Sequence, residues 1–172
     1  MIKQSTTALT LVAALALTFL VGCAGHKTLY TEREEDAKKG RMAVRVVKTA
    51  RSQLGNLYRV GGANPQKGFD CSGFVQWVYV QHHVPLPRTT EDQLKAGEKV
   101  KKDDLKPADL VFFKIDKGNF FSFFSQGNLH VGLYTGNGKF IHSPRVGEHV
   151  REEYLEEKYW DKRYIGSRRI LK

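Results

Sequence analysis

Cysteine is scarce in this 172-residue chain, which contains only Cys23 and Cys71. No group of cysteine and histidine residues has the spacing of a metal site, so we expect neither zinc nor another cofactor. Internal repeats are also absent. The main apolar run covers residues 8–21. It is too short for a typical membrane-spanning helix, and polar sequence follows it closely.

The first 22 residues have the pattern of a targeting segment. Lys3 supplies the positive charge that precedes the apolar run, and the run ends in Leu20-Val21-Gly22-Cys23. This ending resembles the bacterial lipobox, which implies cleavage before Cys23 and attachment of lipid to that residue. An ordinary signal peptide with an incidental cysteine is the alternative.

Lipidation of Cys23 would anchor the chain to a membrane, since several acyl chains on one residue give stable binding where a single chain does not. Ala24 follows the cysteine, and no aspartate is there to indicate retention in the inner membrane. We therefore expect a cell-envelope lipoprotein, placed in the outer membrane and facing the periplasm if the host is Gram-negative.

Residues 23–172 comprise 150 residues with a net charge of +9, because only Lys3 is lost from the formal +10. This length suits one domain with a proper core. We expect a polar tether over residues 23–40 and a catalytic domain over 41–172. The positive charge indicates either an ordinary solvated surface or a surface that is attracted to anionic cell wall and membrane. No nucleic acid partner is expected outside the cytoplasm.

The order of the predicted elements indicates an α+β domain, with helices first and an antiparallel sheet afterwards. Apolar residues at helical spacing predict a helix over 41–54, and a second helix begins at about Cys71 after a loop rich in glycine. A short helix and a charged connector are expected over 91–102. Strands are predicted over residues 110–115, 130–135, 139–143 and 164–171.

Cys71 has the position of a nucleophile. It begins the second predicted helix, where the helix dipole and the free N–H groups of the first turn favour thiolate over thiol. With Cys23 lipidated, Cys71 has no disulfide partner in the chain. A free thiol in an exported protein is consistent with catalysis.

His130 and His142 lie on a predicted hairpin whose turn decides whether they can meet. A two-residue turn at Asn137-Gly138 would place them on opposite faces of the sheet. A three-residue loop, residues 136–138, pairs His142 with Gly132 and puts both histidines on one face, close enough for their rings to meet. We predict the three-residue loop, with Gly132 leaving open the space between the rings.

This arrangement suits a cysteine–histidine relay. His130 would take the proton from Cys71, and His142 would orient the ring of His130. Either histidine taken alone is more often a surface or core residue, and the lone thiol favours the catalytic interpretation. The remaining histidines have no such neighbours and are expected at the surface: His26, His82, His83 and His149.

Several short motifs together resemble the NlpC/P60 family of bacterial cell-wall cysteine peptidases, which have a reduced papain-like fold. The resemblance runs from about residue 41 to residue 172. It rests on the segments Tyr58-Arg59-Val60-Gly61-Gly62, Phe69-Asp70-Cys71-Ser72-Gly73-Phe74, Asp109-Leu110-Val111-Phe112-Phe113, His130-Val131-Gly132-Leu133-Tyr134 and Phe140-Ile141-His142-Ser143.

The resemblance implies the same triad, with Cys71 as nucleophile, His130 as base and His142 as orienting residue. It further implies that Tyr58 lies beside the active site and that Asp70 and Ser72 help bind the substrate peptide. The backbone N–H of Cys71 and the hydroxyl of Tyr58 are candidate donors to an oxyanion. Tyr58 as a core aromatic is the alternative.

Two features depart from the family pattern. Ala108 stands where the family usually has glycine. Residues 114–128 form an insertion before the hairpin that contains Phe120, Phe121, Phe123 and Phe124. These side chains either extend a strand and are partly buried, or form a flap that contacts substrate, a protein partner or the membrane.

The leading hypothesis is a lipid-anchored peptidoglycan endopeptidase that hydrolyses amide bonds of stem peptides or their cross-links through an acyl-enzyme. A non-catalytic lipoprotein that binds cell wall or a partner is a second hypothesis, although binding alone does not require Cys71, His130 and His142 together. Amidase or transpeptidase chemistry on the same scaffold is a third.

Overall fold

The computed structural model describes residues 31–115 and 128–172, and the chain divides into two compact units, Met1–Gly40 and Arg41–Lys172. The predictions for Cys23 and for Phe120–Phe124 lie outside the described residues. Residues 31–51 are helical, and residues 31–40 of the first unit are almost all exposed. No helix in the described ranges is long and apolar enough to cross a membrane.

The second unit begins with the remainder of this helix, residues 41–51, which buries Val46, Val47 and Ala50 as the helical spacing predicts. The predicted end at residue 54 is three residues too far. Residues 52–55 form a turn, Gly55 has a φ of +85°, and Leu54 is 49% exposed rather than part of the core. A left-handed glycine is a common way to end a helix.

Helix α2 (Cys71–Val80) begins at the predicted residue because Asp70 caps it. The Asp70 Oδ1 atom accepts a hydrogen bond of 2.7 Å from the backbone N–H of Gly73, which satisfies a donor that the first turn leaves free. The apolar face of α2 is buried, with Phe74, Val75 and Val78 inaccessible to solvent. A short helix, α3 (Thr90–Gln93), follows and is capped by Thr89.

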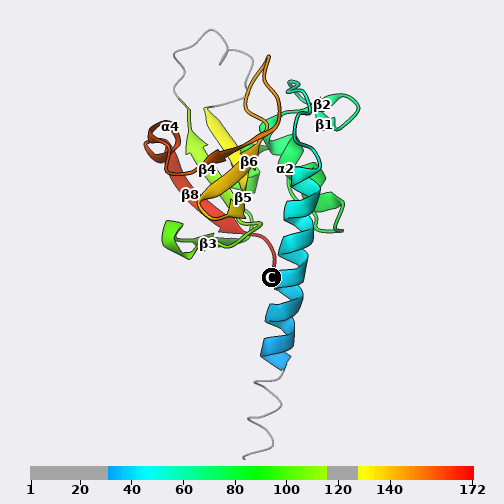
Figure 1. Ribbon diagram of the computed structural model, residues 1–172, viewed down its shortest axis with the longest axis vertical. Helices are drawn as coiled ribbons and strands as arrows, with labels where there is room; N and C mark the ends of the chain where they lie inside the picture. Colours follow the sequence, from blue (N-terminus) through cyan, green and yellow to red (C-terminus); the bar gives the residue numbers. More distant parts are fainter. Residues whose placement is uncertain (1–30, 116–127) are drawn as a thin grey trace, which may run out of the picture. The chain divides into compact units, whose positions relative to one another are not determined.

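A six-stranded antiparallel sheet forms the second half of the unit, in the order β3-β8-β4-β5-β6-β7 (Figure 1). The α+β prediction is confirmed. The predicted strands are observed as β4 (Leu110–Lys114), β5 (Leu129–Gly136), β6 (Lys139–His142) and β8 (Tyr164–Arg169).

Several short elements were not predicted from the sequence. Two are edge strands of the sheet, β3 (Glu98–Val100) and β7 (Arg151–Tyr154), and two form a separate two-stranded sheet, β1 (Ala63–Asn64) and β2 (Gly68–Phe69). The others are the 3-10 turn η1 (Lys102–Asp104) and helix α4 (Lys158–Asp161). All are four residues or fewer, too short to show a periodic pattern.

The β5–β6 hairpin has the predicted register, but its turn differs from the predicted one. Leu133 pairs with Ile141, which sets Gly132 against His142 as expected. The turn itself is the two-residue Asn137-Gly138, with φ values of +53° and +71°, so the three-residue loop is wrong. A shift of register between Tyr134 and Gly136 leaves Thr135 without a partner on β6. This bulge adds one residue to β5, and the pairing therefore shifts by one residue, as the longer loop would have shifted it.

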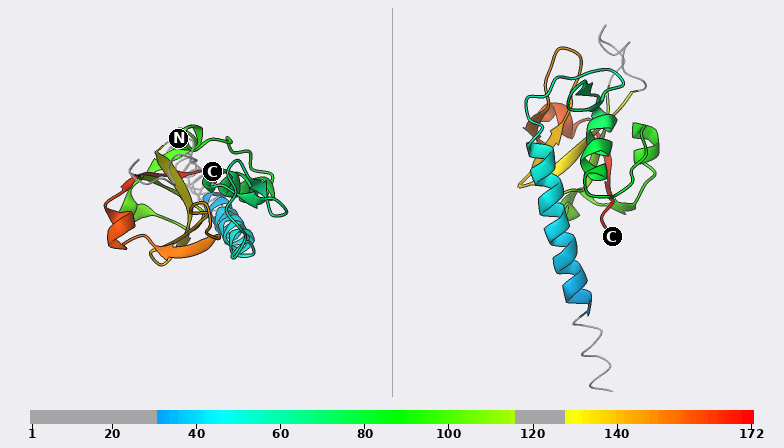
Figure 2. Two further views of the ribbon diagram at one scale, coloured as in Figure 1. Left: turned by 90° about the horizontal axis from the view of Figure 1, so that it is seen from above. Right: turned by 90° about the vertical axis from the view of Figure 1, so that its right-hand side faces the viewer.

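The two faces of the sheet bury different clusters. Leu110 and Phe112 of β4 pack in the cluster that includes the apolar face of α2, which lies along one side of the sheet (Figures 1 and 2). Val111 and Phe113 point the other way and pack with Phe140 and with two residues beyond the hairpin, Leu155 and Trp160. Successive side chains of β4 therefore alternate between two hydrophobic cores, one on each face of the sheet.

Gly73 provides a test of how α2 is seated. A Cβ atom there would lie 2.1 Å from the backbone oxygen of Gly62, which cannot move freely because it accepts a hydrogen bond from the Asp70 N–H. We expect Gly73→Ala to lower the free energy of unfolding by about 1–3 kcal/mol, more than the gain in helix propensity.

Chemical denaturation measures this change. Gly40→Ala is the control, because a Cβ at Gly40 meets nothing within 4 Å and should be neutral or slightly stabilising. Equal stabilities for the two variants would contradict the close contact at Gly73.

Candidate active site

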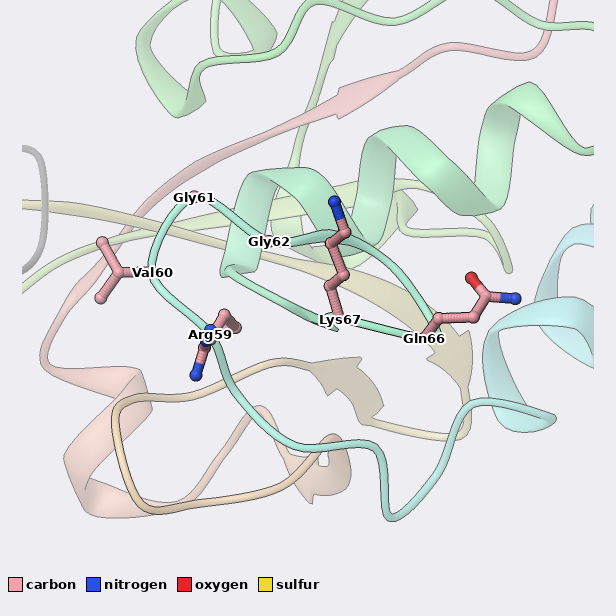
Figure 3. Close-up of a pocket in the computed structure, with 6 residues that line it drawn as sticks. All are labelled: Arg59, Val60, Gly61, Gly62, Gln66 and Lys67. Carbon is pink, nitrogen blue, oxygen red and sulfur yellow. The ribbon is translucent and has the colours of Figure 1, made fainter.

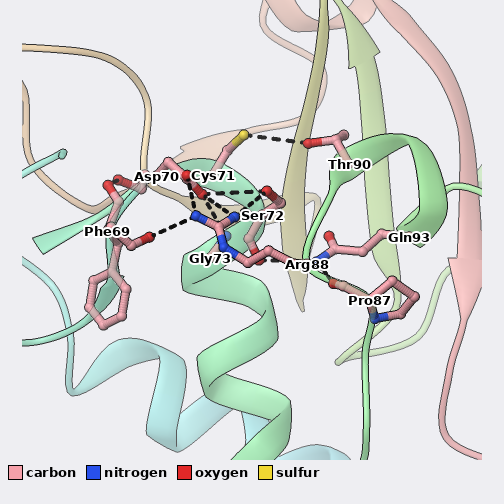
Figure 4. A network of polar contacts seen from close by, with 11 residues as sticks. Phe69, Asp70, Cys71, Ser72, Gly73, Pro87, Arg88, Thr90 and Gln93 are labelled. Carbon is pink, nitrogen blue, oxygen red and sulfur yellow. Dashed lines mark hydrogen bonds and ion pairs between the residues drawn. The ribbon is translucent and has the colours of Figure 1, made fainter. Parts of the chain in front are cut away.

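The Cys71 thiol occupies the first position of α2, half-buried between α3 and β5. Its Sγ atom lies 3.7 Å from the Thr90 hydroxyl (Figure 4). It also hydrogen-bonds with the backbone of Val131, the residue that follows His130 in β5. The thiol is thus held at the strand that carries the first candidate histidine.

The prediction that the helix start favours thiolate is not borne out for the resting site. Burial raises the pKa of the Cys71 thiol above its ordinary value, and the neighbouring Asp70 carboxylate raises it further. Hydrogen bonds from Thr90 and from the backbone of Val131 and Ser72 act in the opposite direction but are smaller. The resting group is therefore a neutral thiol.

The two histidines meet as predicted. His130 Nε2 lies 2.7 Å from His142 Nδ1, and the two rings are nearly perpendicular at 87°. Both side chains are buried, and the Trp160 ring stacks on His130 with centroids 5.6 Å apart. Burial lowers the pKa of both rings, and the proximity of His142 lowers that of His130 further. The pair is neutral at rest.

Glu153 extends the pair to a third group that the sequence did not reveal. His142 Nε2 lies 3.0 Å from Glu153 Oε2, which also accepts a hydrogen bond from the Trp160 indole N–H. Arg151 donates from Nε to the other carboxylate oxygen at 2.7 Å. Although burial opposes it, the contacts with His142 and Arg151 lower the pKa of Glu153 to about 2. The carboxylate is ionised.

Tyr58 lies at the site rather than only in the core. Its side chain is 8% exposed. Burial and, to a smaller extent, the nearby Asp70 carboxylate raise the pKa of its hydroxyl well above the ordinary value. The hydroxyl therefore stays protonated and is available as a hydrogen-bond donor beside the thiol.

Asp70 and Ser72, expected to bind substrate, are held by protein groups in this structure. The Arg88 guanidinium donates to both Asp70 oxygens, at 3.0 and 2.5 Å, and to the Ser72 hydroxyl at 3.0 Å (Figure 4). The Nη2 atom, which donates to Asp70 Oδ2, also lies 3.4 Å from the Gly62 carbonyl oxygen. Arg88 was not identified from the sequence, where it follows two prolines in an irregular segment.

Gly132 has a different role from the one predicted. A Cβ atom there would lie 2.5 Å from the Phe140 ring, not between the histidines. Phe140 in turn contacts the His142 ring with centroids 4.9 Å apart. Gly132 therefore admits Phe140, which packs behind the histidine pair.

A surface pocket of about 440 Å³ borders the loop that precedes Cys71 (Figure 3). It is lined by Arg59, Val60, Gly61, Gly62, Gln66 and Lys67. Its two cationic side chains give it a positive character. Across residues 31–115 and 128–172, no cluster of three or more His, Cys, Asp or Glu side chains is arranged to hold a metal ion.

A cysteine at a helix start and a buried histidine pair on an adjoining antiparallel sheet define a papain-like α+β domain. The family model described as "NlpC/P60 family" matches residues 55–169, and the chain belongs to this family.

Curated relatives agree with this family assignment. The murein DD-endopeptidase MepH of Escherichia coli is 40% identical over 123 residues, which cover 69% of this chain and 42% of MepH. The probable endopeptidase NlpC of the same organism is 36% identical over 157 residues, 88% of this chain and 92% of NlpC. The gamma-DL-glutamyl hydrolase of Bacillus subtilis is 39% identical over 127 residues, which cover 73% of this chain and 29% of the hydrolase. The chain thus spans less than half the length of MepH and of the hydrolase.

Solved structures of the family have the same fold. An NlpC/P60 family protein from Bacillus cereus matches with a TM-score of 0.66 and 35% identity, covering 76% of this chain and 40% of that one. The NlpC/P60 domain of the peptidoglycan hydrolase SagA matches with a TM-score of 0.60 and 29% identity, covering 74% and 97%. The predicted papain-like fold is confirmed.

The raised pKa of Cys71 leads to a test on Asp70. Asp70→Asn keeps a good helix cap but removes the negative charge that disfavours thiolate. We expect the pKa of the thiol, measured from the pH dependence of its alkylation by iodoacetamide, to fall in this variant.

Asp92→Asn is the matched control, because Asp92 is an exposed residue of α3 that pairs with Lys95. Residues 24–172 are used so that Cys71 is the one thiol present. A pKa that stays constant or rises in Asp70→Asn would contradict the electrostatic account.

Proposed function

We propose that the chain is a cysteine peptidase that hydrolyses amide bonds in peptidoglycan stem peptides or their cross-links. The observation that carries the proposal is the buried pair of His130 and His142, whose ring nitrogens lie 2.7 Å apart. His130 is on β5, and the backbone of the residue after it, Val131, hydrogen-bonds with the Cys71 thiol. A protein that only binds cell wall has no need of this combination. The names of the relatives, which are endopeptidases and glutamyl hydrolases, support the substrate class.

The resting groups give the order of the proton transfers. His130 takes the proton of the Cys71 thiol as the sulfur attacks the carbonyl carbon of the peptide bond, so that a free thiolate need not accumulate. The carbonyl oxygen becomes an oxyanion that the Cys71 N–H and the Tyr58 hydroxyl stabilise. His130 then protonates the leaving amine, and water releases the acyl group from the sulfur.

The proposed location is the cell envelope, with the membrane bound through lipidated Cys23. The lipobox-like segment before Cys23 and the net charge of +9 on residues 23–172 support this placement. The charge would also favour contact with the carboxylates of the cell wall. Arg59 and Lys67, the two cations of the pocket at the loop that precedes Cys71, would add to this attraction.

Digestion of purified peptidoglycan tests the activity. Residues 24–172 should release peptide fragments whose masses identify the bond cut, and Cys71→Ala should release none. Products that persist in Cys71→Ala would contradict the role of Cys71. Binding without products from either protein would instead support a cell-wall-binding function.

Tyr58 gives a test of the proposed oxyanion donor. Tyr58→Phe removes one hydroxyl and leaves the buried ring in place, so the fold should be retained. We expect kcat on soluble muropeptides to fall by about 100-fold or more, with a much smaller change in KM, because the lost hydrogen bond forms in the transition state.

Tyr79→Phe is a useful comparison, because the Tyr79 hydroxyl donates to the Ala108 carbonyl oxygen in the core. It should reduce stability and leave kcat close to that of the unsubstituted chain. Similar kcat values for Tyr58→Phe and the unsubstituted chain would exclude the oxyanion role.

A further inference from the structure

We propose that Glu153 is a positioning residue of the active site: it fixes the tautomers of His142 and His130 so that the free nitrogen of His130 is Nδ1. The inference rests on the proposed function and adds a fourth residue to the relay. It is carried by a continuous chain of contacts, Glu153 Oε2 to His142 Nε2 at 3.0 Å and His142 Nδ1 to His130 Nε2 at 2.7 Å.

The chemistry of the carboxylate determines the direction of each hydrogen bond. An ionised carboxylate only accepts, so His142 must carry its proton on Nε2. In a neutral ring the Nδ1 atom of His142 is then an acceptor, and His130 must donate to it from Nε2. The lone pair of His130 is left on Nδ1, ready to take a proton.

Without an acceptor behind it, His142 could adopt the opposite tautomer. It would then donate from Nδ1 to His130 Nε2, and His130 would have its proton on Nδ1, where the base is needed. A histidine pair can satisfy its own hydrogen bond in either direction, so a third group has to choose between them. Glu153 is the group in contact with the far nitrogen.

The surroundings hold Glu153 in place for this role. Phe140 and Glu153 are paired across β6 and β7, which puts the carboxylate on the face of the sheet that carries His142. Its oxygens are engaged by the Trp160 indole N–H at 2.5 Å and by Arg151 at 2.7 Å. Both groups can only donate hydrogen bonds, so they favour the ionised carboxylate, which is an acceptor toward His142.

Glu153 also bears on the charge that the relay acquires. When His130 takes the thiol proton, a cation forms at a buried site, where burial and the Arg151 charge both disfavour it. Glu153 opposes them, and its charge raises the pKa of both rings. Glu148, which pairs with Arg151, acts in the same direction on His142.

Glu153→Gln is the decisive substitution, because glutamine has nearly the same shape. Its carbonyl oxygen keeps the Arg151 hydrogen bond at the Oε1 position, which puts the NH2 group at the Oε2 position. There the NH2 group donates to His142 and the Trp160 hydrogen bond is lost, so the choice of tautomer is lost together with the charge. We expect kcat to fall about 10- to 100-fold, the usual effect of removing such an outer partner. The acid limb of the pH–kcat profile should move to lower pH, since the histidine pair is a weaker base without the carboxylate.

Glu152→Gln is the matched control. Glu152 is the neighbouring residue of the same strand, but it pairs with Ile141 on the other face and forms an ion pair with Arg51 at 2.9 Å. This variant should keep the rate, the pH profile and the histidine tautomers of the unsubstituted chain. Stability of all variants is measured in parallel by thermal unfolding.

Nitrogen-15 NMR of the histidine-labelled full chain in detergent reads the tautomers directly, with six rings to assign. The unsubstituted chain should show both His130 and His142 protonated on Nε2, and Glu153→Gln should show Nδ1 protonation in the pair. A merely structural role would change stability and leave these signals as they are.

The possible outcomes separate the two proposals. Nδ1 protonation of His130 in the unsubstituted chain, or unchanged tautomers and an unchanged pH profile in Glu153→Gln, would overturn the role of Glu153. An unsubstituted chain without any activity, but with the expected tautomers and their loss in Glu153→Gln, would contradict the peptidase function and leave the tautomer control by Glu153 supported.

Discussion

The register of the β5–β6 hairpin is the constraint on which the rest of the site depends. A shift of one residue would turn His142 to the opposite face of the sheet and break its 2.7 Å contact with His130. The tight Asn137-Gly138 turn alone would produce that shifted pairing. The bulge at Thr135 restores the register, so one unpaired residue on β5 makes the histidine pair possible. The bulge is therefore as necessary to the site as either ring.

Burial sets the chemistry of this site, and the network around it offsets the cost. The Cys71 thiol and both histidines are neutral at rest because removal from water disfavours their charged forms more than their neighbours favour them. The permanent charge in contact with the histidine pair is the Glu153 carboxylate, which is kept ionised by His142 and Arg151. Charge thus enters the relay only when a proton moves, and a counter-charge is already in position.

Much of the fold could be predicted from the sequence, and the exceptions have physical reasons. The helix at α2 follows from the spacing of its apolar residues, and strand β4 from a short apolar run. Cys71, His130 and His142 follow from residue type and position. The exposed position of Leu54 could not be predicted, because the helix ends at a glycine turn before reaching it. Arg88 and Glu153 act through contacts between distant segments, which no local pattern records. Ala108, noted as a departure from glycine, has a φ of +74°, which explains why glycine is usual there.

The position of Glu153 at the edge of the sheet has a consequence for how such sites are recognised. The segments that carry the family resemblance end at residue 143, while β7 is a four-residue edge strand that begins at Arg151. An edge strand pairs on one side only, so it is less constrained than the strands inside the sheet. Glu153 of this strand nevertheless contacts the His142 ring directly. The relay is therefore assembled from the shared segments but tuned by an element outside them, and chains with identical short motifs need not have equally basic histidine pairs.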